Sequence, residues 1–307
     1  MKKIDFHVHI DNDEVTVEES ARYFNEMCER KGYEGVGIMA LTHDSQIFHP
    51  ACNERALAIK ALVPGAVAFG SPHHNGDFVE QVEELMSRGF SGIKLLGGKP
   101  SQYREFGYGF EHPRYEALFS YCEKYGVPLT VHNNDPLVHW DITKASPRTI
   151  ANGWVYDEKI PSQEWFFLTM EAVLARHPKL KIALAHFGFY SNDLPRATAL
   201  MEMYGGLMMD ITPAPPIYVE LSQTPKESEA FFRKYHDRII FGTDVDNGIF
   251  GRVREFNDTK TEMISTFLEG TEPCVVKDKY PITPISLEPY MLENIYYNNA
   301  MRFIGKA

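Results

Sequence analysis

Eight short apolar runs, each about the length of one strand, recur along the chain and constrain its fold more than any other feature. Several are apolar without polar alternation, such as the run at 36–41. Unbroken apolar runs are expected of parallel strands that are covered on both faces. The eight runs lie at 3–9, 35–41, 66–71, 92–96, 128–132, 181–186, 206–211 and 238–243.

Helix signals separate these runs. Capping-box pairs, in which a Thr and a Glu three residues later bond each other's backbone amides, predict helix starts at Thr16, Thr224 and Thr259. Strand and helix therefore alternate eight times, which predicts an α/β fold with a parallel sheet closed into a single (β/α)8 TIM barrel. An open doubly wound sheet is the alternative, but no G-x-G-x-x-G motif follows the first run to support a dinucleotide fold.

The length of 307 residues suits one barrel domain spanning 1–307, with insertions predicted near 135–161 and 274–289. The net charge of −11 argues against binding nucleic acid, which needs a basic face. No run reaches the roughly 18 apolar residues of a membrane span. The amino-terminal residues MKKIDFH place polar groups where a signal peptide has its apolar run, so a cytoplasmic location is expected.

Five side chains that can bind metals stand at the ends of these predicted strands. His7 and His9 are two residues apart, so both leave the same face of the first strand. His132 ends the fifth run, His186 ends the sixth, and Asp244 follows the eighth. In a barrel these positions meet at the carboxyl-terminal mouth, where such enzymes carry out their chemistry. An H-x-H pair alone is weak evidence, but the combination predicts a metal centre.

These residues belong to segments that resemble the amidohydrolase superfamily, and more narrowly its amidohydrolase-related branch, which includes aminocarboxymuconate-semialdehyde decarboxylase. The closing segment ENIYYNNA at 293–300 is similar to the last helix of that branch, so the resemblance runs nearly end to end. The motifs that carry it are DFHVH at 5–9, GIKL at 92–95, TVH at 130–132, LAHFG at 184–188 and FGTD at 241–244.

The resemblance implies one divalent ion, Zn²⁺ with Mn²⁺ as the alternative, held by His7, His9, His132 and Asp244. It also implies that His186 contacts the activated water or the substrate. The chemistry of the residues agrees, because neutral imidazoles and a carboxylate suit zinc. A divalent ion can lower the pKa of bound water to near 7. Asp244 can then accept the proton of that water, and His186 can stabilise or protonate the reacting oxygen.

Two basic residues are candidate contacts for a substrate carboxylate. Lys94 is the third residue of GIKL and is predicted to face the pocket, although it could instead be carbamylated between two metals or pair with Asp210. Arg252 could bind an anion through paired hydrogen bonds, or could be a surface arginine. His43 and the histidine pair at 73–74 depart from the branch pattern, and could line the pocket, form a second metal site or be solvated loop residues.

These observations predict an enzyme that hydrolyses a small, carboxylate-bearing ester, lactone or amide with metal-activated water. Non-oxidative decarboxylation at the same site is the alternative. A phosphoesterase is less favoured because the chain has no basic run. A non-catalytic binding barrel is less favoured because no expected site residue is missing. The expected partner is a small-molecule substrate, and the resemblance makes a homo-oligomer possible.

Overall fold

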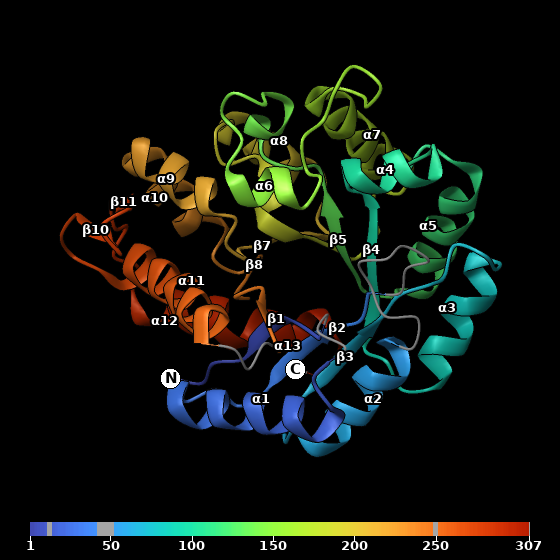
Figure 1. Cartoon of the computed structure of the whole chain (residues 1–307), viewed down its shortest axis with the longest axis horizontal. Coiled ribbons are helices and arrows are strands. Elements are labelled where there is room, and N and C mark those ends of the chain that lie inside the picture. Colours follow the sequence, from blue (N-terminus) through green and yellow to red (C-terminus); the bar gives the residue numbers. More distant parts are fainter. Residues whose placement is uncertain (11–13, 42–51, 248–250, 307) are drawn as a thin grey trace.

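A single parallel sheet of nine strands forms the centre of the described part of the protein, as seen in a computed structural model (Figure 1). The structure describes residues 1–10, 14–41, 52–247 and 251–306. Hydrogen bonding orders the strands β8-β7-β6-β5-β4-β3-β2-β1-β9. They are β1 Asp5–His9, β2 Val36–Met39, β3 Val67–Gly70, β4 Gly92–Gly98, β5 Leu129–Asn133, β6 Ile182–Leu184, β7 Leu207–Asp210, β8 Ile239–Ile240 and β9 Val245–Asp246.

The sheet has one strand more than the eight predicted, because β9 follows the eighth run, which contains only β8. β8 pairs with β7, whereas β9 pairs with β1. Between them the chain stays bonded to β1: the Phe6 amide donates to the Phe241 carbonyl at 3.1 Å, and the Asp244 amide to the His7 carbonyl at 2.8 Å. Asp244 has a φ of 55°, which interrupts the extended backbone. The curled sheet is consistent with a TIM barrel.

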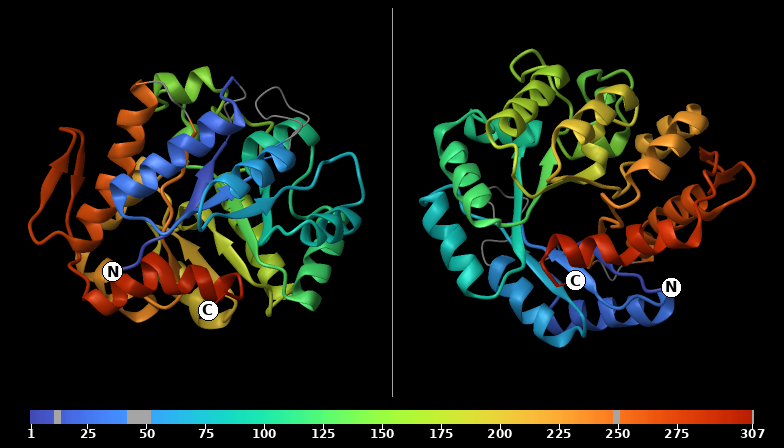
Figure 2. Two further views of the ribbon diagram at one scale, coloured as in Figure 1. Left: turned by 90° about the horizontal axis from the view of Figure 1, so that it is seen from below. Right: turned by 180° about the vertical axis from the view of Figure 1, so that it is seen from behind.

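Helices cover the outer face of the sheet (Figure 2). A large apolar core lies between the helices and the strands. None of the helices in the described ranges has the length and apolar composition needed to cross a bilayer. The α-helices are α1 Val17–Lys31, α2 Cys52–Leu62, α3 Phe78–Ser87, α4 Pro100–Phe106, α5 Pro113–Tyr125, α6 Pro147–Ala151, α7 Gln163–Arg176, α8 Leu194–Met203, α9 Pro215–Gln223, α10 Pro225–Tyr235, α11 Gly251–Glu269, α12 Pro289–Glu293 and α13 Asn299–Phe303.

The predicted helix starts have mixed outcomes. Thr16 caps α1 in a complete capping box with Glu19. Thr224 stands at the start of α10, but its side chain makes no capping hydrogen bond. The start predicted at Thr259 is wrong, because this residue lies inside α11 and its hydroxyl donates to the Glu255 carbonyl at 2.9 Å. A threonine inside a helix can bond the preceding turn in this way, so the local pattern alone does not mark a start.

A bulge in β1 aims side chains into the interior of the curled sheet. The pairing of β1 with β2 gains one extra residue on β1 between Asp5 and Val8. Phe6 packs edge-on against Phe69 of β3, with ring centroids 5.2 Å apart, in an inner apolar cluster below the site. The next residue, His7, reaches the polar site above that cluster. Bulges re-aim side chains in this way beside active sites.

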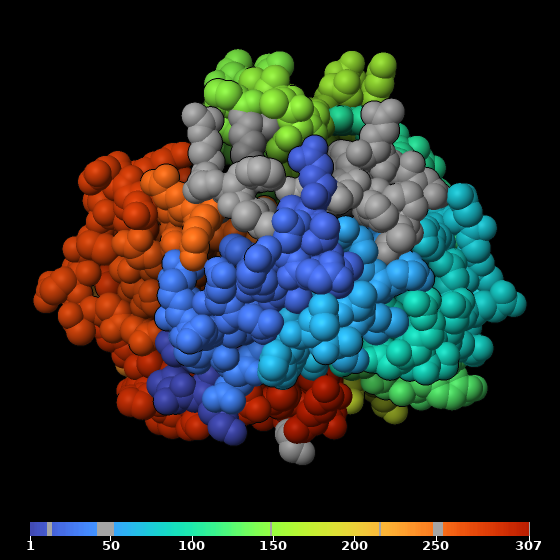
Figure 3. Space-filling model, turned by 60° about the horizontal axis from the view of Figure 1, so that its bottom comes forward, coloured from blue at the N-terminus to red at the C-terminus, as the bar shows by residue number. Residues whose placement is uncertain are grey.

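Both predicted insertions carry structure of their own. The connection at 135–161 contains a short 3-10 helix and α6, and forms the green projection at the top of Figure 3. Arg104 of α4 holds it by donating to the carbonyls of Gly153 and Val155, each at 2.6 Å. The connection at 274–289 contains an antiparallel hairpin of β10 Cys274–Val276 and β11 Tyr280–Ile282.

Candidate active site

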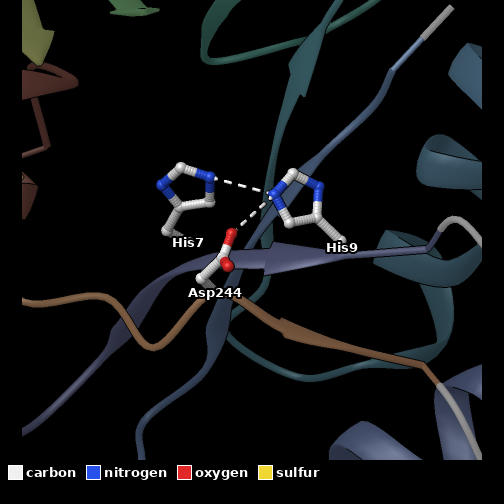
Figure 4. A group of neighbouring side chains, drawn as sticks. All are labelled: His7, His9 and Asp244. Carbon is white, nitrogen blue, oxygen red and sulfur yellow. Dashed lines mark hydrogen bonds and ion pairs between the residues drawn. The ribbon is translucent and has the colours of Figure 1, made fainter. Parts of the chain in front are cut away.

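Three of the predicted metal ligands converge above the sheet interior. His7 Nε2 lies 3.2 Å from His9 Nε2, which lies 3.1 Å from Asp244 Oδ1. Figure 4 shows the three side chains turned toward one another, the two histidines from β1 and Asp244 from the segment between β8 and β9. Among the residues that the structure describes, this is the group whose donor atoms all lie within 4.8 Å of one another.

The second ring nitrogen of His7 is held by a carboxylate. His7 Nδ1 lies 2.5 Å from Asp210 Oδ2, and both side chains are buried. Burial, reinforced by the nearby Lys94 ammonium, holds the pKa of His7 well below its usual range. Burial also raises the pKa of Asp210, to about 6. At neutral pH the histidine is therefore neutral and the aspartate ionised, so Nδ1–H donates and Nε2 presents its lone pair to the site.

Asp244 is held by contacts from two sides. Its neighbour Thr243 donates to the buried Asp5 carboxylate through its backbone N–H at 2.9 Å and its hydroxyl at 2.5 Å. Lys260 of α11 donates to Asp244 Oδ2 at 3.0 Å. Burial alone would raise the pKa of Asp244, but Lys260 and His9 outweigh it and hold that pKa well below its usual range. Asp244 is therefore a carboxylate at neutral pH.

The other two predicted site histidines form an adjoining pair. The ring of His186 lies 4.8 Å from that of His132 and 6.2 Å from that of His7, measured between centroids. His186 Nδ1 lies 3.2 Å from the Thr212 carbonyl, which can only accept, so its Nε2 carries the lone pair. His132 Nε2 lies 3.3 Å from Asp135 Oδ1, outside the group of three converging donors. Burial lowers the pKa of His132 to about 4 and that of His186 to about 3.

Of the remaining predicted residues, the structure places one in the site, does not describe the side chains of two, and places one in a packing contact. Lys94 is almost fully buried and its Nζ lies 3.1 Å from His7 Nε2, so the lysine is part of the site. Arg252 lies in α11, but its side chain is outside the described part of the structure. His43 also falls outside the described residues. His74 stacks on Phe106 with centroids 3.6 Å apart, which indicates a packing role for this loop histidine.

The donor set fits a divalent cation. Three neighbouring donors are two neutral imidazole nitrogens and an ionised carboxylate oxygen, a set that suits zinc. The hydrogen bond from His7 to Asp210 is the second support, because ligand histidines usually donate their other N–H to a carboxylate or carbonyl. The residues present therefore match a metal centre in both the atoms that would bind and the atoms that orient them.

The sequence patterns missed several polar residues around this centre. Asp210, which the sequence suggested only as a partner for Lys94, ends β7, where the strand-end rule would have selected it as a site residue. Lys99 follows β4 directly, and donates to both oxygens of Asp135 at 2.9 and 3.1 Å. Tyr156, from the insertion, donates to the same carboxylate at 2.5 Å. Lys260 lies in the middle of a helix, where no sequence signal distinguishes it from a solvated lysine.

Comparison with known proteins assigns this chain to a family. The amidohydrolase family model matches residues 4–306. A search of curated protein sequences gave no significant match. Among solved structures, a probable 2-pyrone-4,6-dicarboxylic acid hydrolase from Acinetobacter baumannii, solved with citric acid bound, is similar with a TM-score of 0.58 and 10% identity, over 99% of this chain and 100% of that chain.

Two further solved structures share the fold. The 2,6-dihydroxybenzoate decarboxylase from Rhizobium has a TM-score of 0.58 and 14% identity, over 99% of this chain and 98% of that chain. An amidohydrolase from Burkholderia multivorans, solved with bound zinc, has a TM-score of 0.58 and 11% identity, over 99% of each chain. At these identities the neighbours show the fold alone, whereas the family model spans nearly the whole sequence. The chain therefore belongs to the amidohydrolase family and is an enzyme of that superfamily.

Proposed function

We propose that this enzyme hydrolyses a small, carboxylate-bearing ester, lactone or amide with water activated by one divalent ion. The observation that carries the proposal is the convergence of His7 Nε2, His9 Nε2 and Asp244 Oδ1, with His7 oriented by Asp210. His7, His9 and Asp244 would hold the ion, and His132 is proposed as the fourth ligand. Zn²⁺ is the proposed ion and Mn²⁺ the alternative, since the donor set suits zinc and one structural neighbour contains it.

When bound, the ion would supply Lewis acidity that brings the pKa of a water molecule near 7. Asp244 is proposed to take the proton from this water as it attacks the acyl carbon. His186 presents an unprotonated Nε2, because its Nδ1 donates to the Thr212 carbonyl, and can orient the water by accepting one of its hydrogen bonds. The proton then leaves with the alcohol or amine as the acyl–heteroatom bond breaks.

A buried lysine in the site, Lys94, supports a substrate that carries a carboxylate. Lys94 is buried beside His7, and we propose that its ammonium binds the substrate carboxylate; Arg252 is proposed as a second contact. Two structural neighbours are named for carboxylated compounds, a pyrone dicarboxylate and a dihydroxybenzoate, which supports the same class. The single domain 1–307, its eight-unit barrel, the cytoplasmic location and the homo-oligomer stay predictions.

Non-oxidative decarboxylation is the second candidate function. The observation that favours it is that the decarboxylase and the hydrolase among the neighbours have the same TM-score of 0.58 to this chain. In this alternative the carbon–carboxylate bond breaks, carbon dioxide leaves, and a proton replaces it on the substrate carbon. Hydrolysis is preferred because it needs only the activated water.

A paired assay tests the two functions. The zinc-loaded protein is incubated with carboxylated lactones, esters and amides, with acid release followed by pH-stat, and with hydroxybenzoates, with carbon dioxide release followed by gas analysis. The proposal expects acid release that a chelator abolishes and that the Asp244→Asn variant lacks. Carbon dioxide release without acid release would establish the decarboxylase instead. Acid release that persists in Asp244→Asn would contradict the proposed site.

A further inference from the structure

Lys260, on the buried face of helix α11, donates a hydrogen bond to the candidate metal ligand Asp244. Lys260 is only 7% exposed. Asn257, one helical turn earlier on the same face, donates to the Asp246 carbonyl of β9 at 3.2 Å. Met263 and Ile264, one turn later, are buried in the core. The apolar contacts of this helix therefore fix Lys260 beside the segment that carries Asp244.

The ammonium of Lys260 is surrounded by partners from that segment. It donates to Asp244 Oδ2 at 3.0 Å and also to the backbone carbonyl of Asp244. The Phe256 ring centroid lies 5.1 Å from Nζ, within the range of a cation–π contact. A buried ammonium is costly unless it is paired and hydrogen-bonded, and these contacts satisfy it. The lysine thus has a defined position rather than a solvated one.

The two carboxylate oxygens of Asp244 have different partners. Oδ2 accepts from Lys260, while Oδ1 lies 3.1 Å from His9 Nε2 and faces the other donors. The backbone of Asp244 is in the left-handed region, where a side chain is seldom found without outside support. The second contact of Lys260, with the carbonyl of the same residue, supplies such support.

We infer that Lys260 is a positioning residue that makes Asp244 a one-oxygen metal ligand by occupying Oδ2 and holding the carboxylate in place. The inference rests on the proposed metal site. Without Lys260, Oδ2 would be free to approach the ion as well. A carboxylate binding through both oxygens would raise the coordination number and use the position that the water needs. Lys260 acts through Asp244 and is not itself assigned to the reacting atoms.

The test compares metal binding by the full-length metal-free protein and its Lys260→Met variant. Zinc affinity is measured by competition with a chromophoric chelator, and the coordination number by the visible absorption of the cobalt(II) form, which weakens as coordination rises above four. We expect Lys260→Met to bind zinc about 10-fold more tightly, because Oδ2 can then add a bond to the ion and a positive charge beside the site is gone. Its cobalt spectrum should be weaker, because the coordination number rises, and a Lys260→Arg variant should bring both properties back toward the wild type.

Lys31→Met is the matched control. Lys31 of α1 pairs with Asp258 of α11 at 3.2 Å, so this variant removes a lysine–aspartate contact to the same helix away from the site. Its metal binding should equal that of the wild type. Unchanged zinc affinity and an unchanged cobalt spectrum in Lys260→Met would overturn the inference. If that variant does not fold, Lys260→Gln decides by the same two measurements. Failure of the wild type to bind one zinc or cobalt ion would instead overturn the proposed metal site, and this inference with it.

Discussion

Replacing Asp210 with Asn would test how the site prepares His7 as a ligand. Asp210 Oδ2 lies 2.5 Å from His7 Nδ1, and Oδ1 accepts the Thr212 amide at 2.9 Å. The amide has nearly the same shape as the carboxylate, so packing is preserved. It has one accepting and one donating end, however, whereas both of its native partners donate.

Either orientation of the new amide carries a cost. If its oxygen keeps the Thr212 amide, its NH2 faces His7 Nδ1, which must then accept and carry its proton on Nε2 instead. A protonated Nε2 has no lone pair for a metal. If the amide turns over, its NH2 meets the Thr212 N–H, and a buried donor without an acceptor costs about 1–3 kcal/mol. We therefore expect a loss of about 10–100-fold in zinc affinity, or about 1.4–2.8 kcal/mol.

Chelator competition on the metal-free protein measures this change directly. Asp77→Asn is the matched control, because Asp77 accepts the Val79 and Glu80 amides at the start of α3, where Asn caps equally well. Thermal unfolding of the metal-free proteins shows whether each variant is folded. A folded Asp210→Asn protein that binds zinc as tightly as the wild type would refute the assigned proton positions and the role of Asp210.

Four further outcomes are expected. Asp244→Asn should lower turnover by about 10²–10⁴-fold, the range for a lost acid–base group, in steady-state assays of a fold-intact protein. Chelator treatment should abolish activity, and added zinc should restore it; activity retained after complete metal removal by elemental analysis would contradict the metal site. Thr243→Val should reduce the free energy of unfolding in urea by about 1–3 kcal/mol, because Asp5 loses a buried donor, and Thr243→Ser should lose less. Gly37→Ala should cost about 1–3 kcal/mol in the same measurement, because the added Cβ would lie 2.2 Å from the Phe6 carbonyl oxygen.

The positions of polar side chains at strand ends predicted correctly that three of them lie close together. His7 and His9 lie on one face of β1 as the two-residue period predicts, although the register shift between Asp5 and Val8 includes His7. Asp244 joins them as its position after the eighth run suggested. The apolar runs did not predict β9, because Val245–Asp246 lies beyond the eighth run, after the left-handed residue Asp244.

The sequence by itself determined the class of fold and the edge of the sheet at which the polar residues meet. Both follow from short-range periodicity, and from the fact that parallel strands end on the same side. Only the tertiary structure decided which atoms touch. His7 and Asp210 are 203 residues apart, and the contact of Lys260 with Asp244 depends on how α11 packs. The packing of distant elements sets such distances. These distances in turn determine which ring nitrogen of His7 carries the proton and which oxygen of Asp244 faces the site.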